Sequence, residues 1–91
     1  YEQAKICAIN LIAQVKAACD GDLDRVVRVV KLGGFVASTP DFTQQPAVVN
    51  GASDLMVAAF GDAGKHARFA VGSSVLPLGC LVEVEGVFEI S

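Results

Sequence analysis

Acidic side chains near the carboxyl-terminal end of this sequence are the first candidates for chemistry. A predicted strand from Leu81 to Ile90 alternates between an acidic face, which carries Glu83, Glu85 and Glu89, and an apolar face. Ionised carboxylates are seldom buried without a partner, so the acidic face requires water or a cation. We interpret Glu85 and Glu89 as solvated or ion-paired residues.

The nearest candidate cation is Arg68, at the start of the preceding predicted strand. If the chain turns back between Val71 and Gly79, Arg68 lies level with Glu83. A guanidinium that faces a carboxylate beside an apolar wall could bind organic acids and handle protons. The alternative is an ion pair that ties two strands or two subunits together, which contributes little stability if it is exposed.

The spacing of these residues resembles the carboxyl-terminal signature of the YjgF/RidA family. The signature comprises Ala67-Arg68, then Leu76-Pro77 eight and nine positions after the arginine, then Glu83-Val84-Glu85 fifteen positions after it. The resemblance implies a homotrimer with a chorismate-mutase-like fold. It also implies an enamine/imine deaminase, a hydrolase that converts reactive amino-acid-derived enamines and imines to keto acids and ammonia without cofactor or metal.

The same resemblance implies roles for four residues at a site between subunits. Arg68 would hold the substrate carboxylate, and Glu83 would position or activate the attacking water. The main chain near Ala70 would add a hydrogen bond where some relatives carry a cysteine. Asn50 stands where relatives often carry an asparagine near the subunit interface, although an exposed polar residue explains it equally well.

Another class of function stays open beside the deaminase. A trimeric module of this fold could bind small carboxylates, or serve a regulatory partner, without catalysis. Keto-acid release that disappears in an Arg68→Ala variant would favour the enzyme.

The predicted elements are two helices and three strands. Helices are expected at Tyr1–Cys19 and Gln44–Phe60, where apolar residues follow a helical period, and a β-branched strand at Val26–Val36. Two further strands are expected at His66–Gly72 and Leu81–Ile90. The order α-β-α-β-β predicts an α+β fold, a chorismate-mutase-like mixed β-sheet with both helices packed on one face.

The 91 residues form one domain at most, and residues 1–91 are predicted to be a single YjgF/RidA-like domain. Hydrophobic residues make up 53% of the chain, so some apolar surface is expected to face a partner subunit. The family carries an N-terminal hairpin before the first helix. This sequence lacks it, and the chain is therefore predicted to be an N-terminally incomplete copy.

Charge and hydropathy argue against two classes of partner. The net charge of -3 and the pI near 4.8 argue against nucleic acid and against the ribonuclease activity described for some relatives. No apolar run approaches the ~20 residues that cross a membrane. The basic cluster of Arg25, Arg28 and Lys31 is interpreted as a solvated or ion-paired edge, with anion binding as the alternative.

The cysteines and the single histidine offer no recognisable motif. Cys7, Cys19 and Cys80 lack metal-binding spacing and are interpreted as small core residues in a reducing compartment, which predicts a cytoplasmic protein; a reactive thiol is the alternative. His66 has no evident Ser/His/Asp or Cys/His partner and is expected on the surface or in a loop. Gly61–Lys65 lacks a complete phosphate-binding loop pattern.

Overall fold

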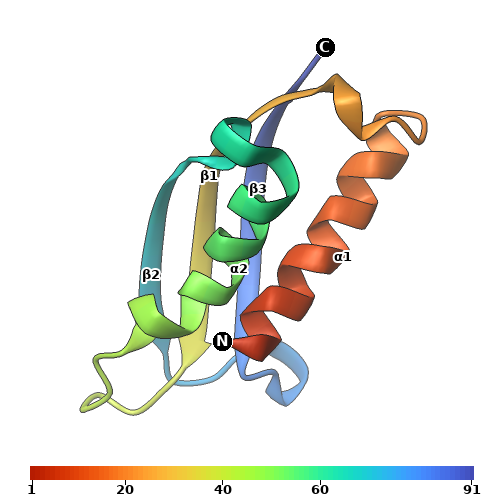
Figure 1. The fold of residues 1–91 in the computed structure, drawn as a ribbon. Helices are drawn as coiled ribbons and strands as arrows, with labels where there is room; N and C mark the ends of the chain where they lie inside the picture. Colours follow the sequence, from red (N-terminus) through yellow and green to blue (C-terminus); the bar gives the residue numbers. More distant parts are fainter.

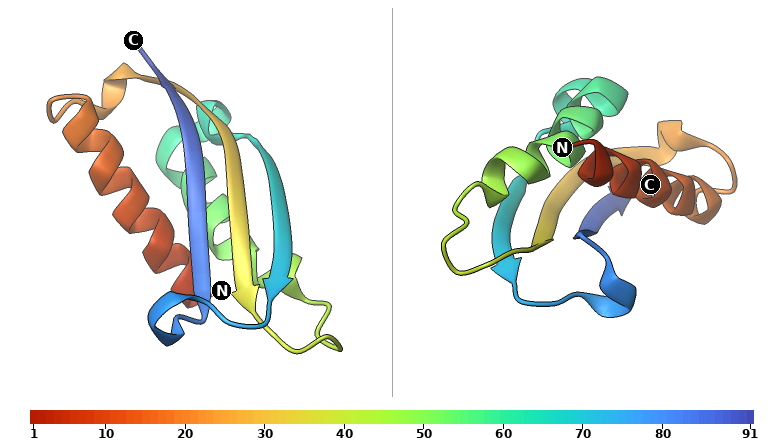
Figure 2. Two further views of the ribbon diagram at one scale, coloured as in Figure 1. Left: turned by 180° about the vertical axis from the view of Figure 1, so that it is seen from behind. Right: turned by 90° about the horizontal axis from the view of Figure 1, so that it is seen from below.

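The computed structural model describes residues 1–91 as a layer of two helices against a layer of three strands (Figure 1). The helices are α1 (Glu2–Ala18) and α2 (Gln45–Phe60), and the strands are β1 (Val26–Ala37), β2 (Ala67–Ser73) and β3 (Val82–Ile90). Short 3₁₀ turns connect them: η1 (Leu23–Arg25), η2 (Gly61–Gly64) and η3 (Pro77–Gly79). Both helices lie on one face of the sheet, which confirms the predicted α+β architecture and the order of its elements (Figure 2).

β1 is the central strand of a mixed sheet whose order is β2-β1-β3. It pairs with β2 in parallel and with β3 in antiparallel orientation. The hypothesis that the chain turns back between Val71 and Gly79 and brings Arg68 level with Glu83 on an adjacent strand is therefore wrong. The segment between them, which contains η3, carries the chain past the end of β1 to its other side (Figure 2).

The register of the sheet assigns each row of residues to one face. Leu32 pairs with both Arg68 and Gly86, and it is fully buried beneath the helices. Phe35 pairs with Glu83, and it lies three residues from Leu32, so its row points to the opposite face. Arg68 therefore faces the helices, whereas Glu83 faces away from them.

The helix-facing side of the sheet holds the core. Leu32 and Val29 of β1 are buried against Met56 of α2, and small residues let the helices approach closely. A Cβ added at Gly34 would overlap the side chain of Val49, and one added at Gly51 would overlap the main-chain oxygen of Tyr1. The absence of a side chain at Gly34 lets α2 lie close to the sheet, and the absence of one at Gly51 lets α2 lie close to the start of α1.

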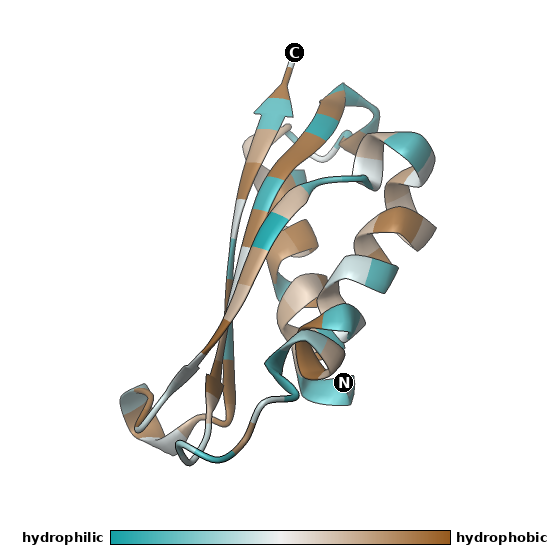
Figure 3. Ribbon diagram, turned by 90° about the vertical axis from the view of Figure 1, so that its left-hand side faces the viewer, coloured by the Kyte–Doolittle hydropathy of each residue, from teal (hydrophilic) through white to brown (hydrophobic).

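The opposite face of the sheet, which we call the outer face, has no helix over it (Figure 3). Phe35 and Phe69 form an edge-to-face pair there with ring centroids 5.3 Å apart, and the ammonium of Lys31 lies 5.2 Å from the Phe69 ring centroid. Val71 and Val87 are exposed on the same face. The outer face is therefore a mixed apolar and charged surface.

α2 ends at Phe60 as predicted, and α1 ends at Ala18, one residue before the predicted Cys19. Cys19 caps α1, and the following Asp20 and Gly21 adopt positive φ values of 55° and 89°. Gly61, with φ of 61°, ends α2. Neither helix has the length and apolar character needed to cross a membrane.

Candidate active site at the junction of β2 and α2

Arg68 lies near the start of β2 with its half-buried side chain against α2. Its Nη1 donates a hydrogen bond to Oγ of Ser53 at 3.1 Å, and its Nη2 donates to the main-chain oxygen of Pro46 at 3.2 Å. Both acceptors are neutral, and no carboxylate of the chain lies within ion-pair distance of this guanidinium. Arg68 therefore has no ionic partner within the chain.

The helix brings a predicted partner to the same place. Asn50 lies four residues after Pro46 and three before Ser53, a spacing that puts all three on one side of α2. Asn50 is exposed there. Ala70 follows Arg68 by two positions on β2 and so shares its helix-facing side. The fold thus gathers three of the four predicted site residues at one junction.

Glu83, the fourth predicted residue, does not join them. It is exposed on the outer face of β3, and it lines a separate hollow of about 250 Å³ with Cys7 and Gln14. Because β1 separates β2 from β3, Arg68 and Glu83 lie two strands apart as well as on opposite faces. Neither the predicted facing pair nor the alternative ion pair forms within one chain.

The structure also reveals a pair that the sequence analysis missed. Oγ of Ser53 lies 2.9 Å from Nε2 of His66, and Nδ1 of His66 lies 2.5 Å from the main-chain oxygen of Gly64. His66 lies in the short loop between η2 and β2, as expected, but it is half-buried and has a serine partner that the sequence did not reveal. A signal existed, since His66 and Arg68 are two residues apart in an extended segment and so point to the same side.

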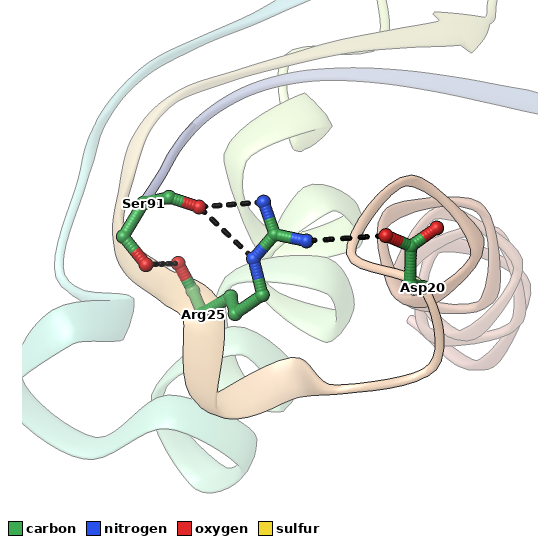
Figure 4. A network of polar contacts seen from close by, with 3 residues as sticks. All are labelled: Asp20, Arg25 and Ser91. Carbon is green, nitrogen blue, oxygen red and sulfur yellow. Dashed lines mark hydrogen bonds and ion pairs between the residues drawn. The ribbon is translucent and has the colours of Figure 1, made fainter.

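The other arginines are neutralised within the chain, as predicted for the basic cluster. Nε and Nη2 of Arg25 donate to the main-chain oxygen of Ser91 at 2.9 and 2.6 Å, and Nη1 lies 3.5 Å from a carboxylate oxygen of Asp20 (Figure 4). Nε of Arg28 lies 2.9 Å from a carboxylate oxygen of Glu89. These contacts tie the start of β1 to its neighbours.

The three cysteines are free and differ in their surroundings. Cys19 is buried as predicted, but Cys80 is exposed, so the expectation of a core residue is wrong there. Burial raises the pKa of the half-buried Cys7 thiol, with smaller contributions from Cys80 and Glu83. No group of three or more His, Cys, Asp or Glu side chains is arranged to hold a metal ion.

Comparison with known proteins gives three consistent findings. A sequence model of the family described as "YjgF/chorismate_mutase-like, putative endoribonuclease" matches residues 1–90. The chain is 53% identical over 89 residues to Protein TCP17 of Trypanosoma cruzi, covering 97% of this chain and 55% of that protein. The structure resembles that of Atu1372 from Agrobacterium tumefaciens, a protein described as having unknown function, with a TM-score of 0.95 and 51% identity.

A second solved structure extends this likeness. It is described as "a putative endoribonuclease" from Shewanella oneidensis MR-1 and matches with a TM-score of 0.84 at 36% identity, over 89% of this chain and 53% of that one. The Atu1372 match covers 97% of this chain and 56% of the other. The chain thus spans about half the length of the relatives it matches.

Proposed function

Because the chain belongs to the YjgF/chorismate-mutase-like family, we propose that it forms part of an enamine/imine deaminase that acts on carboxylate-bearing substrates. Membership of the family supports a small-molecule-processing or endoribonuclease-like role. The arrangement of Arg68 at the junction of β2 and α2 favours the small-molecule role, because it suits a carboxylate ligand.

The proposal depends on one observation, which is that the guanidinium of Arg68 has no ionic partner within the chain. An arginine that is half-buried yet held only by a hydroxyl and a main-chain oxygen has no anion to balance it. A guanidinium has five N–H groups, and two are used here, so three remain for a ligand. Planar carboxylates fit such a fork in bidentate fashion.

The reaction would begin with the substrate carboxylate bound to Arg68 and the enamine in its imine form. Water adds to the imine carbon and transfers a proton to a carboxylate base, and the nitrogen gains a proton. The carbinolamine then releases ammonia, leaving the keto acid. Fixing the substrate at one end places the imine carbon for attack, which is a contribution of orientation.

Glu83 is the proposed base, and it would come from a neighbouring protomer. Within one chain it lies on the opposite face from Arg68. The exposed valines of the outer face, Val71 and Val87, support a second copy packing there, since large apolar side chains left in water favour an interface. In the proposed homotrimer, Glu83 of one protomer would meet Arg68, Asn50 and the main chain at Ala70 of the next.

The first experiment measures keto-acid release from an amino-acid-derived enamine. Arg68→Ala is expected to lower kcat/KM by about 100-fold, because hydrogen bonds to a charged group contribute about 1.5–3 kcal/mol each. Arg28→Ala is the matched control and should keep normal activity, since its guanidinium is paired with Glu89. Equal activity of wild type and Arg68→Ala would refute the proposed site.

The second experiment tests the shared site by mixing protomers. Arg68→Ala and Glu83→Gln are each expected to lose most of their activity. A co-expressed one-to-one mixture should recover about one quarter of the wild-type sites, because each site draws one residue from each of two protomers. A mixture that stays inactive would show that the site does not combine Arg68 and Glu83 across an interface.

The binding-module alternative predicts a different result. Wild-type protein would then bind a keto acid such as pyruvate but release product only at the uncatalysed rate. The endoribonuclease description of the family and of the Shewanella oneidensis structure supplies a further alternative. RNA cleavage that persists in both Arg68→Ala and Glu83→Ala would indicate a different site for that activity.

A further inference from the structure

We propose that Ser53 and His66 are positioning residues that fix the orientation of the Arg68 guanidinium, and that keto-acid affinity depends on them. This inference rests on the proposed function of Arg68 as the carboxylate-binding residue. It assigns a role to a serine and a histidine that the proposed chemistry does not use.

The main-chain oxygen of Gly64 determines which ring nitrogen of His66 donates a hydrogen bond and which accepts one. Nδ1 of His66 lies 2.5 Å from the main-chain oxygen of Gly64, and a carbonyl oxygen can only accept, so Nδ1 carries a hydrogen. In a neutral imidazole, Nε2 is then an acceptor. The Ser53 hydroxyl, 2.9 Å away, donates to it.

The direction of this bond determines what the hydroxyl offers Arg68. The single hydroxyl hydrogen of Ser53 points to His66, so an oxygen lone pair is free for Nη1 of Arg68 at 3.1 Å. The main-chain oxygen of Pro46 holds Nη2 at 3.2 Å. Two acceptors on α2 therefore fix the plane of the guanidinium relative to the helix.

The far end of this chain of hydrogen bonds is closely packed against α2. Gly64 is buried, and a Cβ there would overlap the main-chain oxygen of Met56, so the turn packs directly on the backbone of α2. The carbonyl that orients His66 therefore moves with the helix that carries Ser53. A glycine at this position is what lets η2 approach so closely.

The charged groups of the neighbouring elements are engaged elsewhere. Asp54 accepts a hydrogen bond from the hydroxyl of Tyr1 at 2.8 Å, and Asp62 pairs with Lys65 at 3.2 Å. No carboxylate therefore holds the guanidinium in place of the hydroxyl. The orientation of Arg68 depends on neutral hydrogen bonds, which leave its charge to a ligand.

The test measures the KM and kcat of keto-acid release and the Kd of pyruvate by calorimetry. Ser53→Ala is expected to raise KM and the pyruvate Kd about five- to tenfold with kcat nearly unchanged, which is the effect of losing about one hydrogen bond. Ser53→Thr keeps the hydroxyl and is the matched control. Thermal unfolding of each variant separates a local effect from a loss of folded protein.

His66 supplies the decisive comparison. His66→Ala removes the acceptor and is expected to raise KM about three- to fivefold, whereas His66→Gln offers an amide oxygen to Ser53 and should stay within about twofold of wild type. In an Arg68→Ala background, Ser53→Ala should have no further effect on pyruvate binding. A purely structural role would instead lower stability in both backgrounds.

The failures of the two proposals are distinguishable. If Arg68→Ala itself leaves pyruvate binding and keto-acid release unchanged, the proposed function is wrong. If Arg68→Ala abolishes both while Ser53→Ala and His66→Ala keep the wild-type KM and Kd, only the positioning role is overturned.

Discussion

Arg28 and Arg68 belong to the same three-stranded sheet, but the chain neutralises only one of them. Arg28, on β1, pairs with Glu89 of β3 at 2.9 Å, and both side chains are more than half exposed. Arg68, on β2, is half-buried and is held by Ser53 and a main-chain oxygen. The more buried arginine is thus the one without a counter-ion.

This difference is what the proposed role of Arg68 in ligand binding depends on. An exposed ion pair contributes little because water already solvates both charges. A partly buried cation without a counter-ion loses some hydration, and a bound anion compensates for that loss with charge-assisted hydrogen bonds. The contrast supports the proposal that Arg68 binds the ligand, and we interpret the Arg28 pair as a tie between two strands.

The largest expected effect on keto-acid binding comes from giving Arg68 a carboxylate partner, as Arg28 has in Glu89. Ser53→Asp would place a carboxylate beside Nη1 of Arg68, so the guanidinium would be neutralised and keto-acid binding should fall by about 100-fold, as in Arg68→Ala. Ser53→Asn adds similar bulk without charge and should cost much less. Equal losses in the two variants, measured by pyruvate calorimetry, would show that bulk and not charge decides binding.

An intermediate effect is expected from adding a methyl group on either side of the sheet. Gly34→Ala would overlap Val49 in the core and should lower the free energy of unfolding by about 1–3 kcal/mol. It should also weaken pyruvate binding, because moving α2 off the sheet carries Ser53 away from Arg68.

Gly33→Ala is the control on the outer face. Its Cβ would overlap the ring of Phe69 and come within 2.9 Å of Cγ of Glu85, and both side chains can move aside in the isolated protomer, where no helix covers this face. The expected loss is below about 1 kcal/mol. Equal destabilisation in denaturant titrations of the two variants would contradict the claim that only the helix-facing side is tightly packed.

The smallest effect is expected at the Arg28 pair. A double-mutant cycle with Arg28→Ala and Glu89→Ala should give a coupling energy of about 0.2–1 kcal/mol that decreases in high salt, because both side chains are exposed. The measurement is chemical denaturation at low and high ionic strength. A coupling energy above about 2 kcal/mol would contradict the interpretation of Arg28 and Glu89 as a weak, exposed ion pair.

Local patterns were sufficient to predict the elements and the arginine. The helical period of α1 and α2, the β-branched run of β1 and the alternation of β3 depend on neighbours within a few residues. The signature around Arg68 identified the family. The order of strands could not be obtained in this way, because whether β2 lies beside β3 depends on where the connection through η3 runs.

The sequence by itself determined that this chain forms two helices and three strands and carries a family signature centred on Arg68, because periodicity and spacing are local properties. Only the tertiary structure decided that β1 separates Arg68 from Glu83 and that Ser53 meets His66 beneath the guanidinium. The contacts of Ser53 with His66 and Arg68 join α2 to the start of β2, and they form only because α2 packs on the sheet. That packing depends on side-chain volumes far apart in the chain, such as Gly34 against Val49.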